Sequence, residues 1–106
     1  MRQFPEAITD RKIRFALVGC GRIAQNHFKA ITQHGERAEL VGITDVDAEA
    51  LASAAKETGA KPYRNIRELL VDTNADIVTL TTPSGLHPEQ AIQVAASGRH
   101  VLTEKP

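Results

Sequence analysis

The sequence predicts an α/β fold, a doubly wound parallel sheet with helices on both faces. Three observations support this prediction. Five short runs of apolar and β-branched residues alternate with segments of helical periodicity, and short links separate them. A glycine-rich turn joins the first run to the first helical segment, and an acidic residue closes the second run. Because right-handed crossovers make such strands parallel, we expect five strands in the order 3-2-1-4-5.

The expected elements alternate along the chain. The strands are expected at residues 13–18, 38–45, 61–64, 75–82 and 100–103. The helical segments should each turn a stripe of small or apolar residues toward the sheet. These stripes are Ile23, His27, Ala30, Ile31 and His34 in the first segment, Ala48, Leu51, Ala52 and Ala55 in the second, and Ala91, Ile92 and Ala95 in the last.

Helix ends are marked by residues suited to capping. Asp47 is expected to cap the second helix, and Asn65 with Glu68 forms a possible capping box. Pro88 suits the first turn of the last helix. Glycines should end the helices, at Gly35 in a left-handed conformation and at Gly59 and Gly98.

The turn after the first strand carries chemistry. Gly19, Gly21 and Ala24 fit the pattern G-x-G-x-x-A between a strand and a helix. Gly19 permits the tight turn, and Gly21 lets the backbone approach a pyrophosphate because it has no Cβ atom. The amides around Arg22 and Ile23 then face the phosphates at a helix N-terminus. A bare pattern of this kind also fits a glycine turn in another α/β unit. Residues on the neighbouring strands are needed to distinguish a dinucleotide-binding turn from that alternative.

Asp45 supplies that context. It ends the second strand about 20 residues after the glycine pattern, where an acid can accept hydrogen bonds from the adenosine ribose. A carboxylate repels a 2′-phosphate, and Val46 and Asp47 offer no arginine to neutralise one, so NAD is favoured over NADP. The alternative is that Asp45 only belongs to the turn and cap of the next helix.

A second group of candidate residues follows the fourth strand. Thr82, Pro83, Ser84 and His87 lie across the expected crevice, where they could hold the nicotinamide half of a cofactor. Alternatively, this segment is an ordinary turn, and His87 only caps the helix that Pro88 begins.

Glu104 and Lys105, which precede Pro106, follow the fifth strand at the same edge of the sheet. A lysine there can reach a substrate oxygen, although a solvated charge is the alternative. His27 is interpreted as a packed core histidine rather than a catalyst. Cys20 is interpreted as a small space-filling thiol.

The composition excludes several classes of protein. Thirteen basic and thirteen acidic side chains cancel, so no excess charge points to nucleic acid or to a membrane surface. A single cysteine rules out an internal disulfide and a cysteine-based zinc cluster, and it favours the reducing cytoplasm. No metal site is expected. Residues 1–12 lack the apolar core of a signal peptide and are interpreted as a mobile arm.

In combination these motifs resemble a known family. G-C-G-R-I-A with His27, Asp45 after the second strand, T-P-S-G-L-H at residues 82–87 and the terminal E-K-P together resemble the N-terminal domain of the Gfo/Idh/MocA oxidoreductases. The resemblance covers residues 14–106. Within that family the G-C-G-R-I-A-Q-N-H and T-P-S-G-L-H-P segments look most like the UDP-N-acetylglucosaminuronate 3-dehydrogenases.

The resemblance implies a Rossmann domain over residues 13–106 that binds NAD and serves an oxidoreductase. Such an enzyme transfers a hydride between nicotinamide and a hydroxyl of a sugar or sugar nucleotide, and it is expected to be a cytoplasmic homo-oligomer. The resemblance makes Lys105 the catalytic candidate. The cofactor-binding candidates are Gly19, Gly21, Arg22, Ile23, Asp45, Thr82, Pro83, Ser84, His87, Glu104 and Lys105.

The family also has a second, mostly antiparallel β domain that holds the substrate, and this domain is absent from the 106 residues. We therefore expect a fragment of a chain about three times longer, which is inactive alone. Two other functions remain open. One is a non-catalytic NAD-sensing or scaffold module, and the other is an S-adenosylmethionine methyltransferase, against which the E-K-P ending and the Arg22-Ile23 helix start argue.

Overall fold

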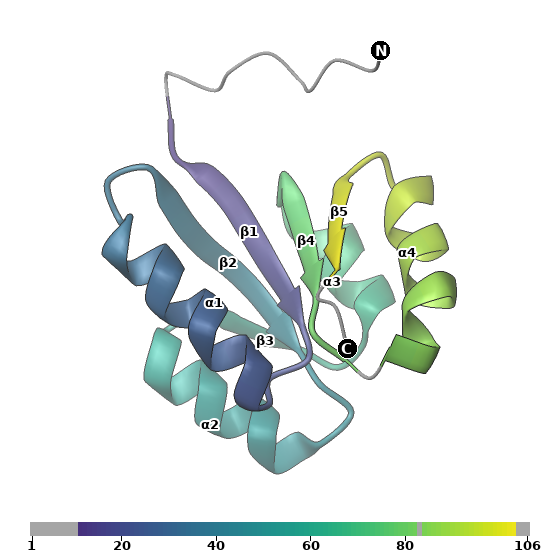
Figure 1. Ribbon diagram of the computed structural model, residues 1–106, viewed down its shortest axis with the longest axis horizontal. Helices are drawn as coiled ribbons and strands as arrows, with labels where there is room; N and C mark the ends of the chain where they lie inside the picture. The colour runs from purple at the N-terminus through teal and green to yellow at the C-terminus, as the bar shows by residue number, and fades with distance from the viewer. Residues whose placement is uncertain (1–10, 83, 104–106) are drawn as a thin grey trace.

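A five-stranded parallel sheet runs through the computed structural model, which describes residues 11–82 and 84–103 (Figure 1). Its order, β3-β2-β1-β4-β5, confirms the predicted topology and the α/β fold class. The strands are β1 Ile13–Val18, β2 Ala38–Thr44, β3 Lys61–Tyr63, β4 Ile77–Leu80 and β5 His100–Thr103. The helices are α1 Arg22–Gln33, α2 Ala48–Thr58, α3 Ile66–Asp72 and α4 His87–Ala96, with a short 3₁₀ turn, η1, at Ser84–Leu86.

The strand predictions fail mainly at β4, which is shorter at both ends than the expected run 75–82. Its ladder with β1 extends from Phe15 opposite Ile77 to Val18 opposite Leu80. Beyond that point Thr81 turns its hydroxyl to the carbonyl oxygens of Val18 and Gly19. The strand therefore stops where β1 gives way to the glycine turn.

Two apolar cores lie on opposite faces of the sheet. Leu17 and Ile43 pack with Ala24, Phe28 and Ala54 on the face that α1 and α2 cover (Figure 1). The other core, under α3 and α4, contains Ala16, Val18, Leu69, Leu70, Val78, Leu80 and Val94. Neighbouring β1 residues thus enter different cores, as expected of a central strand covered on both faces.

The predicted helix stripes need correction. Helix α1 buries Ala24 and Phe28 with Ile31 partly buried, whereas Ile23 is 43% exposed. Ala24, at the first turn, faces β1, and positions four and seven residues later follow it on the same face. The other predicted members, Ala30 and His34, are exposed.

The stripes of α2 and α4 differ in the same way. In α2, Ala54 is buried, Leu51 and Ala55 are partly buried, and Ala48 and Ala52 are exposed. In α4, Val94 is fully buried and Ala91 packs partly against it, whereas Ile92 is 71% exposed and Ala95 is exposed. The predicted stripes thus include residues that pack partly toward the sheet, but they miss the most buried residue of each helix, Ala54 in α2 and Val94 in α4.

Most predicted caps are confirmed. The Asp47 side chain accepts hydrogen bonds from the amides of Glu49 and Ala50, and Asn65 accepts one from the amide of Glu68. Gly59 ends α2 with a φ of 76°. The prediction for Gly35 is wrong, because its φ is not positive and α1 already ends at His34.

An ion pair closes the amino end of the sheet. Both guanidinium nitrogens Nη1 and Nη2 of Arg11 lie 2.8 Å from the carboxylate oxygens of Asp76. That carboxylate also accepts the amide of Arg14 at 2.8 Å, so it joins the start of β1 to the start of β4. The hydrogen bond from Arg11 lowers the pKa of Asp76.

Among the described helices, none has the length and apolarity to cross a membrane.

We predict that Asp76→Asn lowers the free energy of unfolding at pH 7 by about 1–3 kcal/mol, because it removes a charge-assisted contact with Arg11. The lowered pKa of Asp76 means that its contribution is present above about pH 4 and is lost as the pH falls through the folded-state value. Urea unfolding of both proteins from pH 7 to pH 3 measures the difference. Glu57→Gln, an exposed carboxylate on α2, is the control, and a difference that does not shrink with acid would contradict the assignment.

Candidate functional site

A cavity of about 610 Å³ opens at the carboxyl end of the sheet. We call it the carboxyl-end cavity. Its wall comes from the ends of β1, β2 and β4, from the turn between β3 and α3, and from α4. It contains four predicted site residues, which are Gly19, Gly21, Asp45 and Thr82. The sheet order reverses direction between β1 and β4, so the cavity lies where doubly wound folds bind ligands.

The glycine turn is fixed by its neighbours on both sides. The amide of Gly19 donates to the carbonyl of Thr44 at 2.8 Å, and its own carbonyl accepts the hydroxyl of Thr81 at 2.8 Å. Gly19 has a φ of 105°, and a Cβ atom there would lie 2.8 Å from Oγ1 of Thr81. This position therefore requires glycine, as the sequence pattern predicted.

Gly21 has a different environment. It precedes α1 with ordinary extended backbone, and a Cβ atom placed there meets no atom of the described residues within 4 Å. Within residues 11–82 and 84–103 no side chain caps α1, so the amides of its first turn are open to a ligand. Arg22 and Ile23 are exposed at that turn, next to the cavity wall. The open space at Gly21 matches a backbone that a phosphate group approaches closely.

Asp45 lies between two turns. One carboxylate oxygen accepts the amide of Cys20 at 2.6 Å, and the other accepts the amide of Asp47 at 2.7 Å. The carboxylate thus ties the glycine turn to the turn that opens α2. A carboxylate has about four acceptor positions, so Asp45 can hold both amides and still accept a diol from the cavity. The capping of α2 falls to Asp47, which separates these two roles.

Cys20 is buried in the same turn, and its thiol donates to the carbonyl of Thr44 at 3.6 Å. Burial, and secondly the charge of Asp45, raise the pKa of the thiol to about 12. The thiol therefore stays protonated near pH 7, which excludes a thiolate nucleophile. Its position agrees with a space-filling role.

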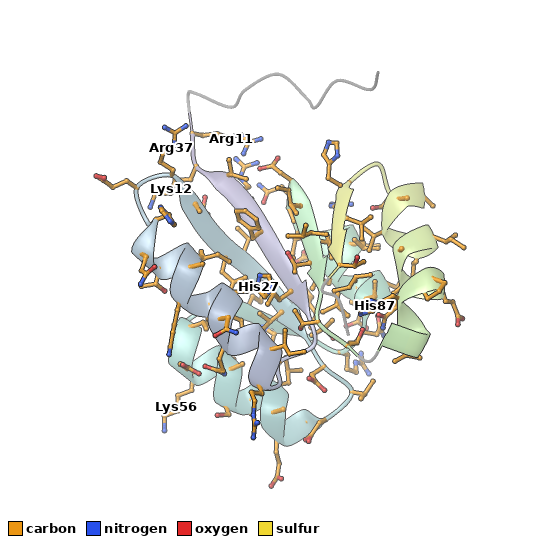
Figure 2. All side chains as sticks on the ribbon, viewed as in Figure 1. Arg11, Lys12, His27, Arg37, Lys56 and His87 are labelled. Atoms are coloured by element: carbon orange, nitrogen blue, oxygen red, sulfur yellow. The ribbon has the colours of Figure 1, made fainter. Side chains whose placement is uncertain are left out.

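The segment after β4 closes on its own helix. Nε2 of His87 donates to the carbonyl of Thr82 at 2.7 Å, and the hydroxyl of Thr82 donates to Oε1 of Gln90. His87 is the first residue of α4 (Figure 2). It contacts the backbone of Thr82 and does not itself form part of the cavity wall. Leu86 holds the cap position, so His87 is not the helix cap.

Several predicted residues are placed only in part. Ser84 begins the turn η1, whereas Pro83, Glu104 and Lys105 lie outside the described residues. His27 is half-buried on α1 next to the buried Phe28, in agreement with a packed histidine (Figure 2).

The cavity wall also contains residues that the sequence analysis missed. They are Val46 after β2, Arg64, Asn65, Ile66 and Arg67 around the start of α3, and Leu86, Gln90 and Gln93 near or on α4. The residues that follow β3, from Arg64 to Arg67, could have been predicted from the strand order. Parallel strands end at one edge of a sheet, so the residue after β3 must lie near the residue after β2.

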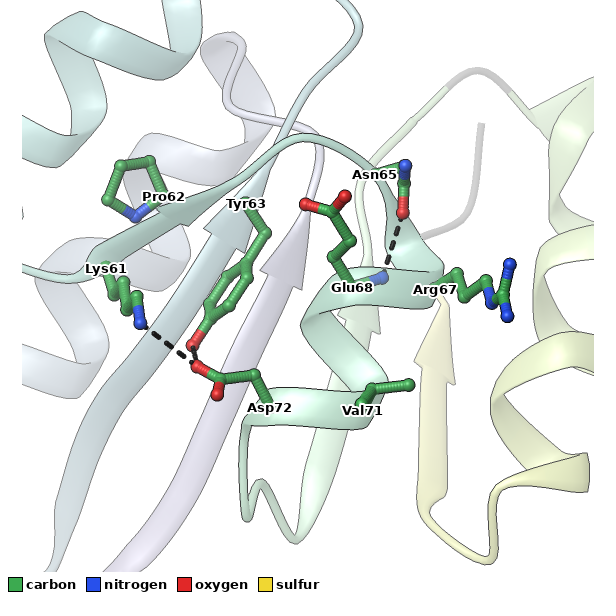
Figure 3. Close-up of a pocket in the computed structure, with 8 residues that line it drawn as sticks. All are labelled: Lys61, Pro62, Tyr63, Asn65, Arg67, Glu68, Val71 and Asp72. Carbon is green, nitrogen blue, oxygen red and sulfur yellow. Dashed lines mark hydrogen bonds and ion pairs between the residues drawn. The ribbon is translucent and has the colours of Figure 1, made fainter.

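A second cavity, of about 570 Å³, lies outside β3 (Figure 3). There the carboxylate of Asp72 accepts the hydroxyl of Tyr63 and, at 3.2 Å, the ammonium of Lys61. Asn65 and Arg67 border both cavities. In this second cavity the polar side chains of Lys61, Tyr63 and Asp72 are hydrogen-bonded to one another. The carboxyl-end cavity contains the glycine turn, and we therefore take it as the candidate site.

Comparisons with known proteins agree with this geometry. A family model described as an oxidoreductase family with an NAD-binding Rossmann fold, GFO_IDH_MocA, matches residues 13–106. The solved WlbA dehydrogenase of Chromobacterium violaceum, in complex with NADH and UDP-GlcNAcA, is 57% identical with a TM-score of 0.94, and the match covers 100% of this chain and 30% of that one.

Two further relatives are similar. The WlbA dehydrogenase of Bordetella pertussis, in complex with the same two ligands, is 61% identical with a TM-score of 0.91 over 94% of this chain and 29% of that one. Inositol 2-dehydrogenase 3 of Saccharopolyspora erythraea is 31% identical over 89% of this chain and 28% of its own length. The chain thus spans less than a third of the length of these relatives.

The two glycines should respond differently to alanine. We predict that Gly19→Ala lowers the free energy of unfolding by about 2 kcal/mol or more, through its positive φ and its contact with Thr81. Gly21→Ala should leave stability near that of the native protein but weaken NADH binding about tenfold or more, which is about 1.4 kcal/mol. Urea unfolding and NADH fluorescence titration measure the two quantities, and unchanged NADH affinity in Gly21→Ala would exclude a close approach there.

Proposed function

Since the chain belongs to the Gfo/Idh/MocA oxidoreductase family, as its NAD-binding Rossmann domain, we propose that it is the cofactor half of a sugar-nucleotide dehydrogenase. The enzyme transfers a hydride between nicotinamide and a sugar hydroxyl. The observation that carries this proposal is the carboxyl-end cavity, whose wall contains the glycine turn and Asp45, which is hydrogen-bonded to that turn. Bound NAD supplies the hydride acceptor, and the residues of this chain bind and orient it.

We propose a place in this cavity for each half of the cofactor. The amides after Gly21 hold the pyrophosphate, because they are uncapped and the Cβ position is open. Asp45 accepts the hydroxyls of the adenosine ribose. The nicotinamide half lies beside Thr82, whose carbonyl accepts a hydrogen bond from His87. Pro83 and Ser84 are proposed as further contacts of that half from their positions in the sequence.

The relatives support a proposal for the substrate class. Two WlbA dehydrogenases, which are 57% and 61% identical to this chain, were solved with UDP-GlcNAcA, and we propose a UDP-N-acetylglucosaminuronate as the substrate. The hydroxyl to be oxidised must lose its proton as the hydride leaves. We propose that Lys105 accepts that proton and that Glu104 contacts the cofactor.

The cellular setting belongs to the same proposal. A free, buried Cys20 suits the reducing cytoplasm, where NAD-dependent metabolism takes place. We also propose that the complete enzyme is a homo-oligomer, since most protein oligomers are built from identical subunits.

We predict that NADH binds more tightly than NADPH, by about tenfold or more, because the charge of Asp45 repels a 2′-phosphate. Isothermal titration calorimetry with both cofactors measures this ratio. Asp45→Ser should narrow it, whereas Asp47→Ser, which removes a neighbouring charge and retains a good helix cap, should not. Equal affinity of the native chain for both cofactors would remove Asp45 from this role.

We predict that Lys105→Met, in a protein that joins this chain to a sugar-binding domain, slows hydride transfer by about 10²- to 10⁴-fold and changes NAD affinity little. Single-turnover kinetics at saturating NAD and UDP-sugar measure the step directly. Lys56→Met, on the exposed side of α2, is the control (Figure 2). An unchanged rate constant would end the catalytic assignment and favour a module that only senses or binds NAD.

A further inference from the structure

Arg64 lies beside Asp45 at the edge of the sheet. Thr44, the last residue of β2, is the register partner of Tyr63, the last residue of β3. Asp45 and Arg64 are the next residues of these two parallel strands, which lie about 4.8 Å apart in such sheets. Both residues form part of the wall of the carboxyl-end cavity. The cavity therefore holds an anionic and a cationic side chain at neighbouring positions.

The two side chains differ in how firmly they are held. Asp45 is fixed by the amides of Cys20 and Asp47, at 2.6 and 2.7 Å. The guanidinium of Arg64 makes an ion pair with Glu68 at 3.2 Å, and its side chain is 85% exposed. An exposed ion pair of this kind is weak. Arg64 can therefore leave Glu68 for a ligand at little cost.

A second cation lies near this position. Arg67 also lines the cavity, and its side chain extends away from the group of Lys61, Tyr63 and Asp72 (Figure 3). Val46 and Asp47, the residues that follow Asp45, offer no arginine beside the ribose. The structure brings the arginine from the end of β3.

We propose that Arg64 is a second specificity-determining residue, which contacts the 2′-phosphate of NADP(H) and opposes the exclusion that Asp45 imposes. This inference rests on the proposed function, because it assumes that the adenosine ribose lies against Asp45. A guanidinium recognises phosphate through paired, charge-assisted hydrogen bonds. Selectivity for NAD(H) is therefore the balance of two neighbouring side chains. Replacing Asp45 by an uncharged side chain makes the cavity a competent NADP(H) site, because the carbonyl of Thr44 and the hydroxyl of Thr81 still hold Gly19.

The test is a double-mutant cycle on the whole chain, with NADH and NADPH titrated by fluorescence. The four proteins are the native chain, Asp45→Ser, Arg64→Gln and the double variant. We expect Asp45→Ser to bind NADPH about tenfold to a hundredfold more tightly than the native chain does. Adding Arg64→Gln should abolish most of that gain and leave NADH affinity within about twofold of Asp45→Ser.

Arg37→Gln in the Asp45→Ser background is the matched control. Arg37 is exposed beside Arg11 and Lys12 at the amino end of the sheet (Figure 2). The substitution Arg37→Gln therefore removes one positive charge, as Arg64→Gln does, but far from the cavity. It should leave the gain intact. Asp45→Asn repeats the cycle with an isosteric side chain that still accepts a hydrogen bond from Cys20, and circular dichroism confirms that each variant is folded.

Two results would overturn the inference. One is an NADPH gain that survives Arg64→Gln, and the other is the absence of any gain in both folded Asp45 variants. Failure of the proposed function looks different, because the folded native chain would then bind neither NADH nor NADPH.

Discussion

The carboxylate of Asp45 is the constraint on which the site depends. It accepts one backbone amide from the glycine turn, at Cys20, and one from the turn that opens α2, at Asp47. Hydrogen bonds to an ionised acceptor are shorter and stronger than those between neutral groups. The glycine turn is thereby fixed to β2, while the hydroxyl of Thr81 fixes it to β4 from the other side. The turn keeps the geometry that a ligand needs before the ligand arrives.

This anchoring explains how an uncapped helix end is tolerated. Helix α1 begins at Arg22, directly after Gly21, and no side chain of the described residues caps it; its first turn contains no acidic residue. Such an end leaves amide donors that a helix otherwise satisfies with Ser, Asp or water. Here the preceding turn is held by Asp45 instead, so the first-turn amides stay available for an anion. Structural support and ligand recognition are thus divided between neighbouring residues, and Asp45 takes part in both.

Much of the fold and part of the site were predictable from the sequence. Local signals acted locally: the glycine pattern gave the turn at Gly19, Asp47 and Asn65 marked helix starts, and strict alternation gave the strand order. Apolar spacing misplaced the buried stripe of α1, whereas Ala24, the small residue of the glycine pattern, does face the sheet and fixes which side of the helix is buried. Arg64 was missed for a related reason, since its neighbour Asp45 is distant in sequence and adjacent only through the register of β2 and β3.

The central claim is that Asp45 holds the glycine turn in its binding geometry, and nitrogen-resolved NMR of the backbone amides tests it most directly. We expect the amide protons of Cys20 and Asp47 to resonate far downfield and to exchange slowly with solvent, because each donates to a carboxylate. Both should shift upfield and exchange faster in Asp45→Ser, while the amide of Gly59, which bonds to the carbonyl of Ala55 in α2, stays unchanged. Amides of Cys20 and Asp47 that do not respond to the loss of the carboxylate would contradict the account.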